Sequence, residues 1–426
     1  MLRCIQGVFG YQKSRTFTID DISRTNKTIH IRDSKSRFDR YTLLADRTLE
    51  ILTEYWFKCG RPTGILFQSS WTGDYLVRDS VNQFFRESAK RAAIQKMVDS
   101  RIYGYTCCEC IDEYYDAVTG WFKRAYNWDV KKEDVLFYNG TNDAVEVALR
   151  AFAGEGVGVI ITKPLYGPLV AGIKNAGCEV VTTKFEIQDG KYRFDFNDLE
   201  EKAKDPNNKV FLLCNPHNPT GRVFDEQELK TIADICRRHD VVIVCDEVHA
   251  DIVRENVKFQ PIAKVAGGQG IVTATAISKS FNCAGLLMTN MIIQDEALRK
   301  EYAAKAGMKM TSSFGVAAVI AAYTKCDDWL REVNLYLDKN IEWALNFLKE
   351  KMPKVKVIPP EGTYMLWMNF EDYGITPAEI RRRIYYDANV ILEEGASFDD
   401  ENGAYYERIC LSTRFDIVKQ AFEDIE

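Results

Sequence analysis

Residues 210–250 read VFLLCNPHNPTGRVFDEQELKTIADICRRHDVVIVCDEVHA, and this stretch contains two short apolar runs with a polar, amphipathic region between them. The runs span residues 210–214 and 241–245, and they do not alternate between apolar and polar side chains. A strand lacks this alternation when both of its faces are buried, as in a sheet that helices cover on both sides. The stretch therefore predicts two buried strands of an α/β fold.

Similar apolar runs recur on both sides of this stretch, from about Asp134 to Ile293, and amphipathic segments separate them. One of these segments has its apolar residues at the i, i+3, i+4, i+7 spacing of a helix. These residues are Val145, Ala148, Leu149 and Phe152. The further predicted strands are 135–138, 157–161, 179–183, 271–274 and 286–293. Strands that alternate with helices in this way predict one large α/β domain.

The sequence changes character after residue 293, where helical stretches become dominant. The predicted elements of this part are helical stretches over 296–351, a helix over 378–385, and strands over 364–370 and 408–411. This mixture predicts a smaller α+β domain. We therefore expect an N-terminal arm with the first part of the small domain (1–88), a large domain (89–328) and a C-terminal small domain (329–426).

The composition restricts the class of protein. The chain has 426 residues, of which 46% are hydrophobic, and its formal net charge is -6. It therefore has enough apolar residues for buried cores, but no basic footprint for nucleic acid. The first ten residues lack the apolar core of a secretion signal, and no run approaches the ~20 apolar residues of a membrane helix. We expect a soluble, cytoplasmic protein with a small-molecule substrate and with no nucleic-acid or membrane partner.

Twelve cysteines are spread along the chain, most of them singly and several in apolar runs, as at Cys214 and Cys245. Buried thiols of this kind pack as small hydrophobic side chains. Cys107, Cys108 and Cys110 form a cluster, but the sequence offers no second cysteine or histidine pair at metal-ligand spacing and has only four histidines. The cluster favours core or redox-sensitive thiols, and we expect no metal site.

Three polar motifs follow predicted strands in a fixed order. They are Cys214-Asn-Pro-His-Asn-Pro-Thr-Gly-Arg222, Val244-Cys-Asp-Glu-Val-His249 and Ala276-Ile-Ser-Lys-Ser-Phe281. Together they resemble the central signature of the fold-type I pyridoxal 5'-phosphate enzymes, the superfamily of the class I and II aminotransferases. With Glu361-Gly-Thr-Tyr364 and Glu407-Arg-Ile-Cys-Leu411, the motifs are most similar to those of cystathionine β-lyases and cystalysin-like carbon-sulfur lyases.

The chemistry of the cofactor gives two of these residues a role. A pyridoxal cofactor needs an amine, and Lys279 follows an apolar strand between small polar residues, where it would hold the cofactor as an internal Schiff base. The cofactor ring also needs a carboxylate that keeps its pyridine nitrogen protonated, and Asp246 directly follows the run 241–245. Taken alone, the lysine could be a surface residue and the aspartate a turn former. Their order within the motifs favours the cofactor roles.

The resemblance implies further contacts with the cofactor. Asn218 would donate a hydrogen bond to the phenolic oxygen, and His249 would lie near the same oxygen, although Asn218 could be a plain turn residue and His249 a packed one. The phosphate needs backbone donors at the start of a helix, which Gly140 and Thr141 supply. Ser278 is a further candidate phosphate ligand.

Three more residues match positions of the family. Tyr105 matches a tyrosine that reaches the phosphate of the neighbouring subunit, so it implies a homodimer. Tyr166 matches the aromatic residue over the ring, and both tyrosines are expected to take part in catalysis. Arg408 matches the arginine that binds the substrate's α-carboxylate, where a planar bidentate donor is suited to the task.

The chain also departs from the family pattern. Residues 68–75 read QSSWTGDY where the lyases carry a short motif that lines the substrate site. Leu287 stands where many relatives have an arginine that neutralises the phosphate, and Ala276 stands where a serine is usual. The identity of the substrate and of the compensating cation therefore stays open.

The resemblance covers most of the chain from about Tyr103, and it implies a mostly parallel seven-stranded sheet in a large cofactor-binding domain with a smaller α+β domain. It implies a lyase that acts on cysteine-derived amino acids such as cystathionine by α,β-elimination, with Lys279 as the general base for the α-proton. Transamination, racemisation, and a specialised biosynthetic elimination or cyclisation remain alternatives. A regulator that keeps the fold without turnover is the non-enzymatic alternative.

Overall fold

The computed structural model describes residues 22–23, 28–31, 40–43, 111–307 and 311–426. The chain forms two compact units, Met1–Lys96 and Met97–Glu426. The described residues of the first unit form a three-stranded antiparallel sheet. Its strands, in spatial order, are β1 (Ile22–Ser23), β2 (Thr28–Ile31) and β3 (Arg40–Leu43).

The second unit is built on a seven-stranded sheet whose order is β4-β12-β11-β10-β9-β5-β6. Its strands are β4 (Val135–Asn139), β5 (Gly158–Thr162), β6 (Glu179–Thr183), β9 (Asn208–Cys214), β10 (Val242–Asp246), β11 (Ile271–Ala276) and β12 (Met288–Ile292). Only β12 is antiparallel to its two neighbours within this sheet. The prediction of a mostly parallel α/β sheet is confirmed.

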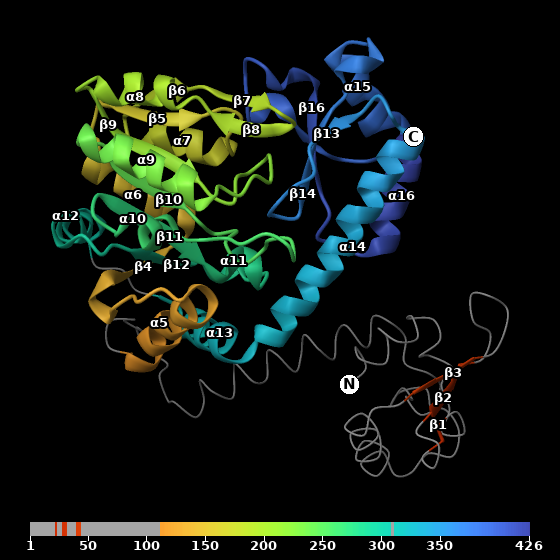
Figure 1. The fold of residues 1–426 in the computed structure, drawn as a ribbon, viewed down its shortest axis with the longest axis horizontal. Coiled ribbons are helices and arrows are strands. Elements are labelled where there is room, and N and C mark those ends of the chain that lie inside the picture. Colours follow the sequence, from red (N-terminus) through yellow and green to blue (C-terminus); the bar gives the residue numbers. More distant parts are fainter. Residues whose placement is uncertain (1–21, 24–27, 32–39, 44–110, 308–310) are drawn as a thin grey trace. The chain divides into compact units, whose positions relative to one another are not determined.

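Helices cover both faces of this sheet, so each central strand contributes to two cores (Figure 1). In β9, Phe211 and Leu213 pack into one core, whereas Val210 and Leu212 pack into the other. The helices of the first core are α5 (Asp112–Tyr126), α8 (Phe196–Lys204), α9 (Glu226–Arg238), α10 (Ile262–Ala266) and α13 (Ser313–Lys325). Those of the second are α6 (Thr141–Phe152), α7 (Gly167–Asn175) and α12 (Glu296–Ala306). This double burial explains why the runs show no alternation.

A third core lies in the C-terminal part of the unit, around a four-stranded antiparallel sheet of order β13-β14-β16-β15. The strands are β13 (Lys356–Val357), β14 (Met365–Asn369), β15 (Glu393–Glu394) and β16 (Tyr406–Cys410). The helices are α14 (Asp327–Lys351), α15 (Pro377–Arg382) with a π-helical turn over Arg383–Asp387, and α16 (Phe415–Ile425). Figure 1 shows α14 running from α13 to this sheet, so one long helix joins the two parts. The smaller α+β part is as predicted.

Candidate functional site

The predicted site residues meet at one edge of the large sheet. Strands β4, β9, β10 and β11 run in the same direction, because β4 and β11 are both antiparallel to β12 and the others are parallel to β11. Their carboxyl ends therefore lie on one side of the sheet, where ligands of α/β proteins bind. Gly140 follows β4, Asn218 follows β9, Asp246 ends β10 and Lys279 follows β11. Residues far apart in sequence are thus placed together by strand direction.

A cavity of about 250 Å³ opens at this edge. It brings together eight predicted site residues: Gly140, Thr141, Tyr166, Asn218, Asp246, His249, Ser278 and Lys279. Arg408 contacts two of them, as described below. Tyr105 lies outside the residues that the structure describes. The Cys107, Cys108 and Cys110 cluster lies outside them as well, and the described residues contain no group of side chains arranged to hold a metal ion.

Lys279 lies on a one-turn helix, α11 (Ile277–Ser280), directly after β11. The neighbouring Ser280 donates a hydrogen bond of 2.7 Å to Asp251. Asp251 also accepts hydrogen bonds from Trp121 and Tyr126 of α5. The turn that carries Lys279 is therefore fastened to α5 through one carboxylate. Sequence reasoning missed Asp251, although it lies only a few residues after the acids Asp246 and Glu247.

Asp246 is 6% exposed, and the backbone N–H of Val248 donates to its Oδ1 at 3.1 Å. Burial raises the pKa of this carboxyl from its usual 3.8 to about 6, and the hydrogen bond and the charge of Lys279 oppose the rise. Burial dominates because a charged group loses its hydration when it enters the protein. An ionised carboxylate with so little compensation is a fitting partner for a protonated ring nitrogen.

His249 is buried, and its pKa falls to about 3 because of burial and the nearby charges of Lys279 and Arg408. Its ring contacts the Tyr364 ring edge-on, with 5.5 Å between centroids. Its Nδ1 has no hydrogen-bond partner among the described residues. Buried polar atoms are normally paired. The neutral imidazole can therefore form a hydrogen bond with a group bound in the cavity.

Arg408 lies on β16 and is held beside the cavity by several contacts. Its Nη1 donates to Asn218 Oδ1 at 2.5 Å, and its Nη2 donates to Glu393. The guanidinium lies 4.6 Å from the centroid of the Phe398 ring and 5.9 Å from that of Tyr166. Burial raises the pKa of Tyr166, so its hydroxyl is protonated at neutral pH. The arginine is thus fixed in place with its charge next to the predicted ring position.

The lining of the cavity around Gly140 has the features of an anion site. Gly140 is the N-cap of α6 at φ 86°, and no side chain caps the helix there, so backbone N–H groups of the first turn face outward. Thr141 Oγ1 lies 3.1 Å from Thr289 Oγ1, and Ser278 lines the same space. Among the described side chains that line the cavity, the one cationic group is that of Lys279. Besides Lys279, the donors that this part of the cavity offers to an anion are therefore hydroxyls and helix N–H groups.

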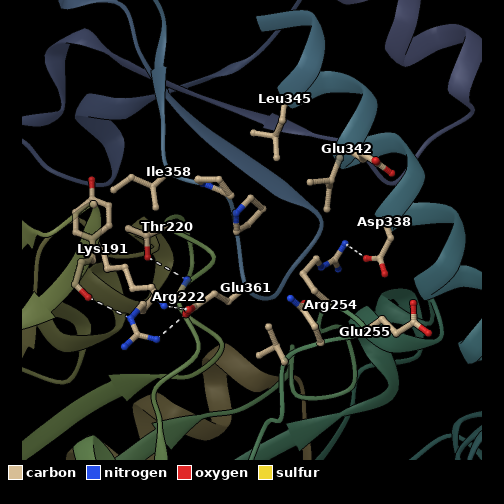
Figure 2. A pocket seen from close by; sticks show the side chains of 17 residues that line it. Lys191, Thr220, Arg222, Arg254, Glu255, Asp338, Glu342, Leu345, Ile358 and Glu361 are labelled. Atoms are coloured by element: carbon tan, nitrogen blue, oxygen red, sulfur yellow. Dashed lines mark hydrogen bonds and ion pairs between the residues drawn. The ribbon is translucent and has the colours of Figure 1, made fainter. Parts of the chain in front are cut away.

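A larger cavity of about 880 Å³ lies elsewhere, between α14, residues 358–361 and the loops near Arg222 and Arg254 (Figure 2). Its two arginines are paired: Arg222 lies 2.5 Å from Glu361, and Arg254 lies 2.5 Å from Asp338. None of the predicted site residues lines this cavity. The smaller cavity is therefore the better candidate for the active site.

Comparisons with known proteins match most of this chain. The family model described as aminotransferase class I and II matches residues 72–415. The cystathionine beta-lyase PatB of Bacillus subtilis is 35% identical over 311 residues, 72% of this chain and 80% of that protein. The protein MalY of Escherichia coli is 26% identical over 317 residues, 74% of this chain and 81% of that protein.

Solved structures also match most of the chain. Cystalysin from Treponema denticola, which contains a pyridoxal 5'-phosphate cofactor, matches with a TM-score of 0.75 and 31% identity, over 79% of this chain and 86% of that chain. A PLP-bound C-S lyase from Staphylococcus hominis matches with a TM-score of 0.74 and 30% identity, over 79% of this chain and 88% of that chain.

None of the helices in the described ranges is both long and apolar enough to cross a membrane.

Proposed function

This chain belongs to the aminotransferase class I and II family, and from this premise we propose that it is a pyridoxal 5'-phosphate-dependent carbon-sulfur β-lyase. Its proposed substrates are cysteine-derived amino acids such as cystathionine, because similar proteins are named cystathionine beta-lyase and C-S lyase. The observation that carries the proposal is the cavity itself, which gathers Lys279, Asp246, Asn218 and His249 around one space.

The residues of the cavity fit this cofactor. When bound, its ring accepts the electrons that are released as a proton leaves the substrate's α-carbon. The buried Asp246 carboxylate would hold a proton on the ring nitrogen, and Asn218 and His249, whose Nδ1 has no hydrogen-bond partner among the described residues, would contact the phenolic oxygen. The first turn of α6, with Thr141 and Ser278, would hold the phosphate.

Two further residues would orient the substrate. Arg408 would bind the α-carboxylate with its planar guanidinium, and Tyr166 would cover the ring. Lys279 Nζ would then take the α-proton as general base. The carbon-sulfur bond breaks, the sulfur leaves as a thiol, and water converts the remaining fragment to pyruvate and ammonia.

Transamination is the alternative, because an aspartate aminotransferase of Pyrococcus horikoshii is also similar, at 26% identity over 80% of this chain. The two reactions share the first proton transfer and differ in the next step: the lyase would lose the β-substituent, whereas in an aminotransferase Lys279 would return the proton to the cofactor and a keto acid would leave. Residues 68–75, where the sequence departs from the lyases, lie outside the described residues.

The wider organisation of the molecule is also part of the proposal. We propose a cytoplasmic homodimer, in which Tyr105 reaches the phosphate site of the partner subunit. We further propose the division into an N-terminal arm with the first part of the small domain (1–88), a large cofactor-binding domain (89–328) and a C-terminal small domain (329–426). The long helix α14, which begins at Asp327, supports the last boundary.

The test is the release of pyruvate and of a free thiol from cystathionine and from other cysteine conjugates, with purified protein that has been supplied with pyridoxal 5'-phosphate. We expect both products in equal amounts, and their loss in Lys279→Ala. Lys300→Ala is the matched control, because Lys300 is an exposed helix residue paired with Glu296. A keto acid that retains the sulfur would support the aminotransferase instead, and no turnover with a fully loaded cofactor would support the regulator.

A further inference from the structure

Arg408 already holds a carboxylate that belongs to the protein. Its Nη2 donates to Glu393 Oε2, while its Nη1 donates to Asn218. A guanidinium binds a carboxylate best through two parallel N–H bonds along one edge. Since Glu393 takes one of the two terminal nitrogens, a substrate carboxylate that binds Arg408 must compete with it.

The pairing of β15 with β16 explains why Glu393 lies at this position. Glu393 stands directly opposite Arg408 in the antiparallel register of the two strands. Side chains of directly opposite residues lie on the same face of a sheet and contact each other. The strand pairing therefore places the Glu393 carboxylate beside the Arg408 guanidinium without any bound molecule.

The two partners differ strongly in exposure. The side chain of Arg408 is 8% exposed, whereas that of Glu393 is 57% exposed. Glu393 can therefore turn into water at little cost, but Arg408 cannot leave the site. A buried guanidinium without a partner is strongly unfavourable. Glu393 thus compensates the charge of Arg408 while the substrate is absent.

We propose that Glu393 occupies the place of the substrate's α-carboxylate on Arg408 and that the incoming carboxylate displaces it. This inference rests on the proposed function, in which Arg408 binds that carboxylate. Glu393 then acts as a built-in competitor, which raises the KM of every substrate and the inhibition constant of simple carboxylates. It takes no part in the proton transfer, so kcat does not depend on it.

The neighbouring residue provides a matched control. Glu394 lies on the same short strand and is 46% exposed, but it pairs with Arg381 at 3.3 Å and not with Arg408. Glu393→Gln and Glu394→Gln remove the same charge from adjacent positions. A difference between them reports the contact with Arg408, since a general change of surface charge would affect both variants alike.

The experiment measures KM and kcat for cystathionine, and the inhibition constant of propionate, in the cofactor-loaded enzyme. We expect Glu393→Gln and Glu393→Ala to lower KM and the inhibition constant by the same factor, roughly two- to fivefold, with kcat unchanged. Glu394→Gln should leave all three values unchanged. An unchanged or raised KM in Glu393→Gln, or an equal fall in Glu394→Gln, would overturn the proposal.

Arg408→Ala separates this inference from the proposed function on which it rests. If Arg408→Ala leaves KM and propionate inhibition unchanged, Arg408 does not bind the substrate carboxylate, and the proposed role of Arg408 fails. If Arg408→Ala weakens binding but Glu393→Gln has no effect, only the inference about Glu393 fails. In the double variant, the effect of Glu393→Gln should disappear, because its one route to the substrate is through Arg408.

Discussion

Replacing Asp246 by asparagine should stabilise the cofactor-free protein and impair the loaded enzyme. Asn keeps the shape of the side chain and can still accept the hydrogen bond from Val248 N–H. It removes a charge from a carboxyl whose pKa burial raises to about 6. Because each pKa unit corresponds to about 1.4 kcal/mol, the ionised Asp246 costs the folded protein about 3 kcal/mol.

The sign of this effect follows from the direction of the shift. A carboxyl with a raised pKa binds its proton more tightly in the folded protein than in the unfolded chain, so the free energy of unfolding falls as pH rises between about 3.8 and 6. Below that window Asp246 is protonated in both states and Asn should change little. Above it, Asp246→Asn should raise the free energy of unfolding by up to about 3 kcal/mol.

Urea unfolding of the cofactor-free protein at several values between pH 4 and pH 8 measures this difference. Glu247→Gln is the control, because burial raises the pKa of Glu247 to about 8 and Glu247 does not line the cavity. Because that carboxyl is protonated in the folded protein but ionised in the unfolded chain between about pH 4.5 and 8, Glu247→Gln should also raise the free energy of unfolding at pH 7, and its effect should go on growing above pH 6, where that of Asp246→Asn levels off. In the loaded enzyme, Asp246→Asn should lower kcat roughly 10²-fold or more with a smaller change in KM. Equal stability of Asp246→Asn and wild type at pH 8, or normal turnover, would refute the reasoning.

Four further outcomes are expected. Lys279→Ala should lose turnover and the borohydride-fixed cofactor, which peptide mass spectrometry would otherwise find on residue 279. Arg408→Ala should weaken substrate binding by roughly 2 to 5 kcal/mol, measured as KM, with a smaller effect on kcat. Glu361→Gln should lower the free energy of unfolding by about 1 to 3 kcal/mol, measured in urea, because it removes a partner of the buried Arg222. Sedimentation at assay concentration should show a dimer, and a fully active monomer would contradict this. Tyr105→Phe should weaken cofactor binding while the protein stays dimeric.

The large sheet could be predicted because burial on both faces leaves a clear signal in the sequence. The predicted strand 179–183 has the same bounds in the structure, and the other six differ by a few residues. The strand predicted over 286–293 begins later, because residues up to Leu287 form a 3₁₀ turn that ends at φ 52°. The sequence does not show that Leu287 has a positive φ, because a leucine within an apolar run looks the same whether it lies in a strand or in a turn.

The hairpin of β7 (Phe185–Gln188) and β8 (Lys191–Phe194) was missed, although a signal for it is present. Asp189 and Gly190 form its turn, both with positive φ, and Asp-Gly is a strong hairpin signal. Its strands are short, and most side chains of β7 are exposed, so the apolar pattern is weak there. Turn chemistry would have located this hairpin where the apolar pattern could not.

The sequence indicated site residues that stand at the ends of strands, where motifs mark them. It missed residues whose role depends on a contact that forms only in the fold. Lys279, Asp246 and Asn218 stand where strands end, and a motif marks each of them. Asp251 and Glu393 matter through the partners that folding gives them, Ser280 and Arg408. No local pattern encodes such a pairing, because it depends on which loop or strand lies opposite.

Charge gives a physical account of why these residues stand together in one cavity. Asp246 keeps a buried carboxylate with little compensation, and the first turn of α6, which no side chain caps, lines the same cavity. A ligand with a protonated ring nitrogen at one end and a phosphate at the other relieves both. Arg408, by contrast, has its charge compensated from within by Glu393. Under the proposed function, the cavity would hold the cofactor between turnovers but release the substrate carboxylate, since only that carboxylate would have an internal replacement, Glu393.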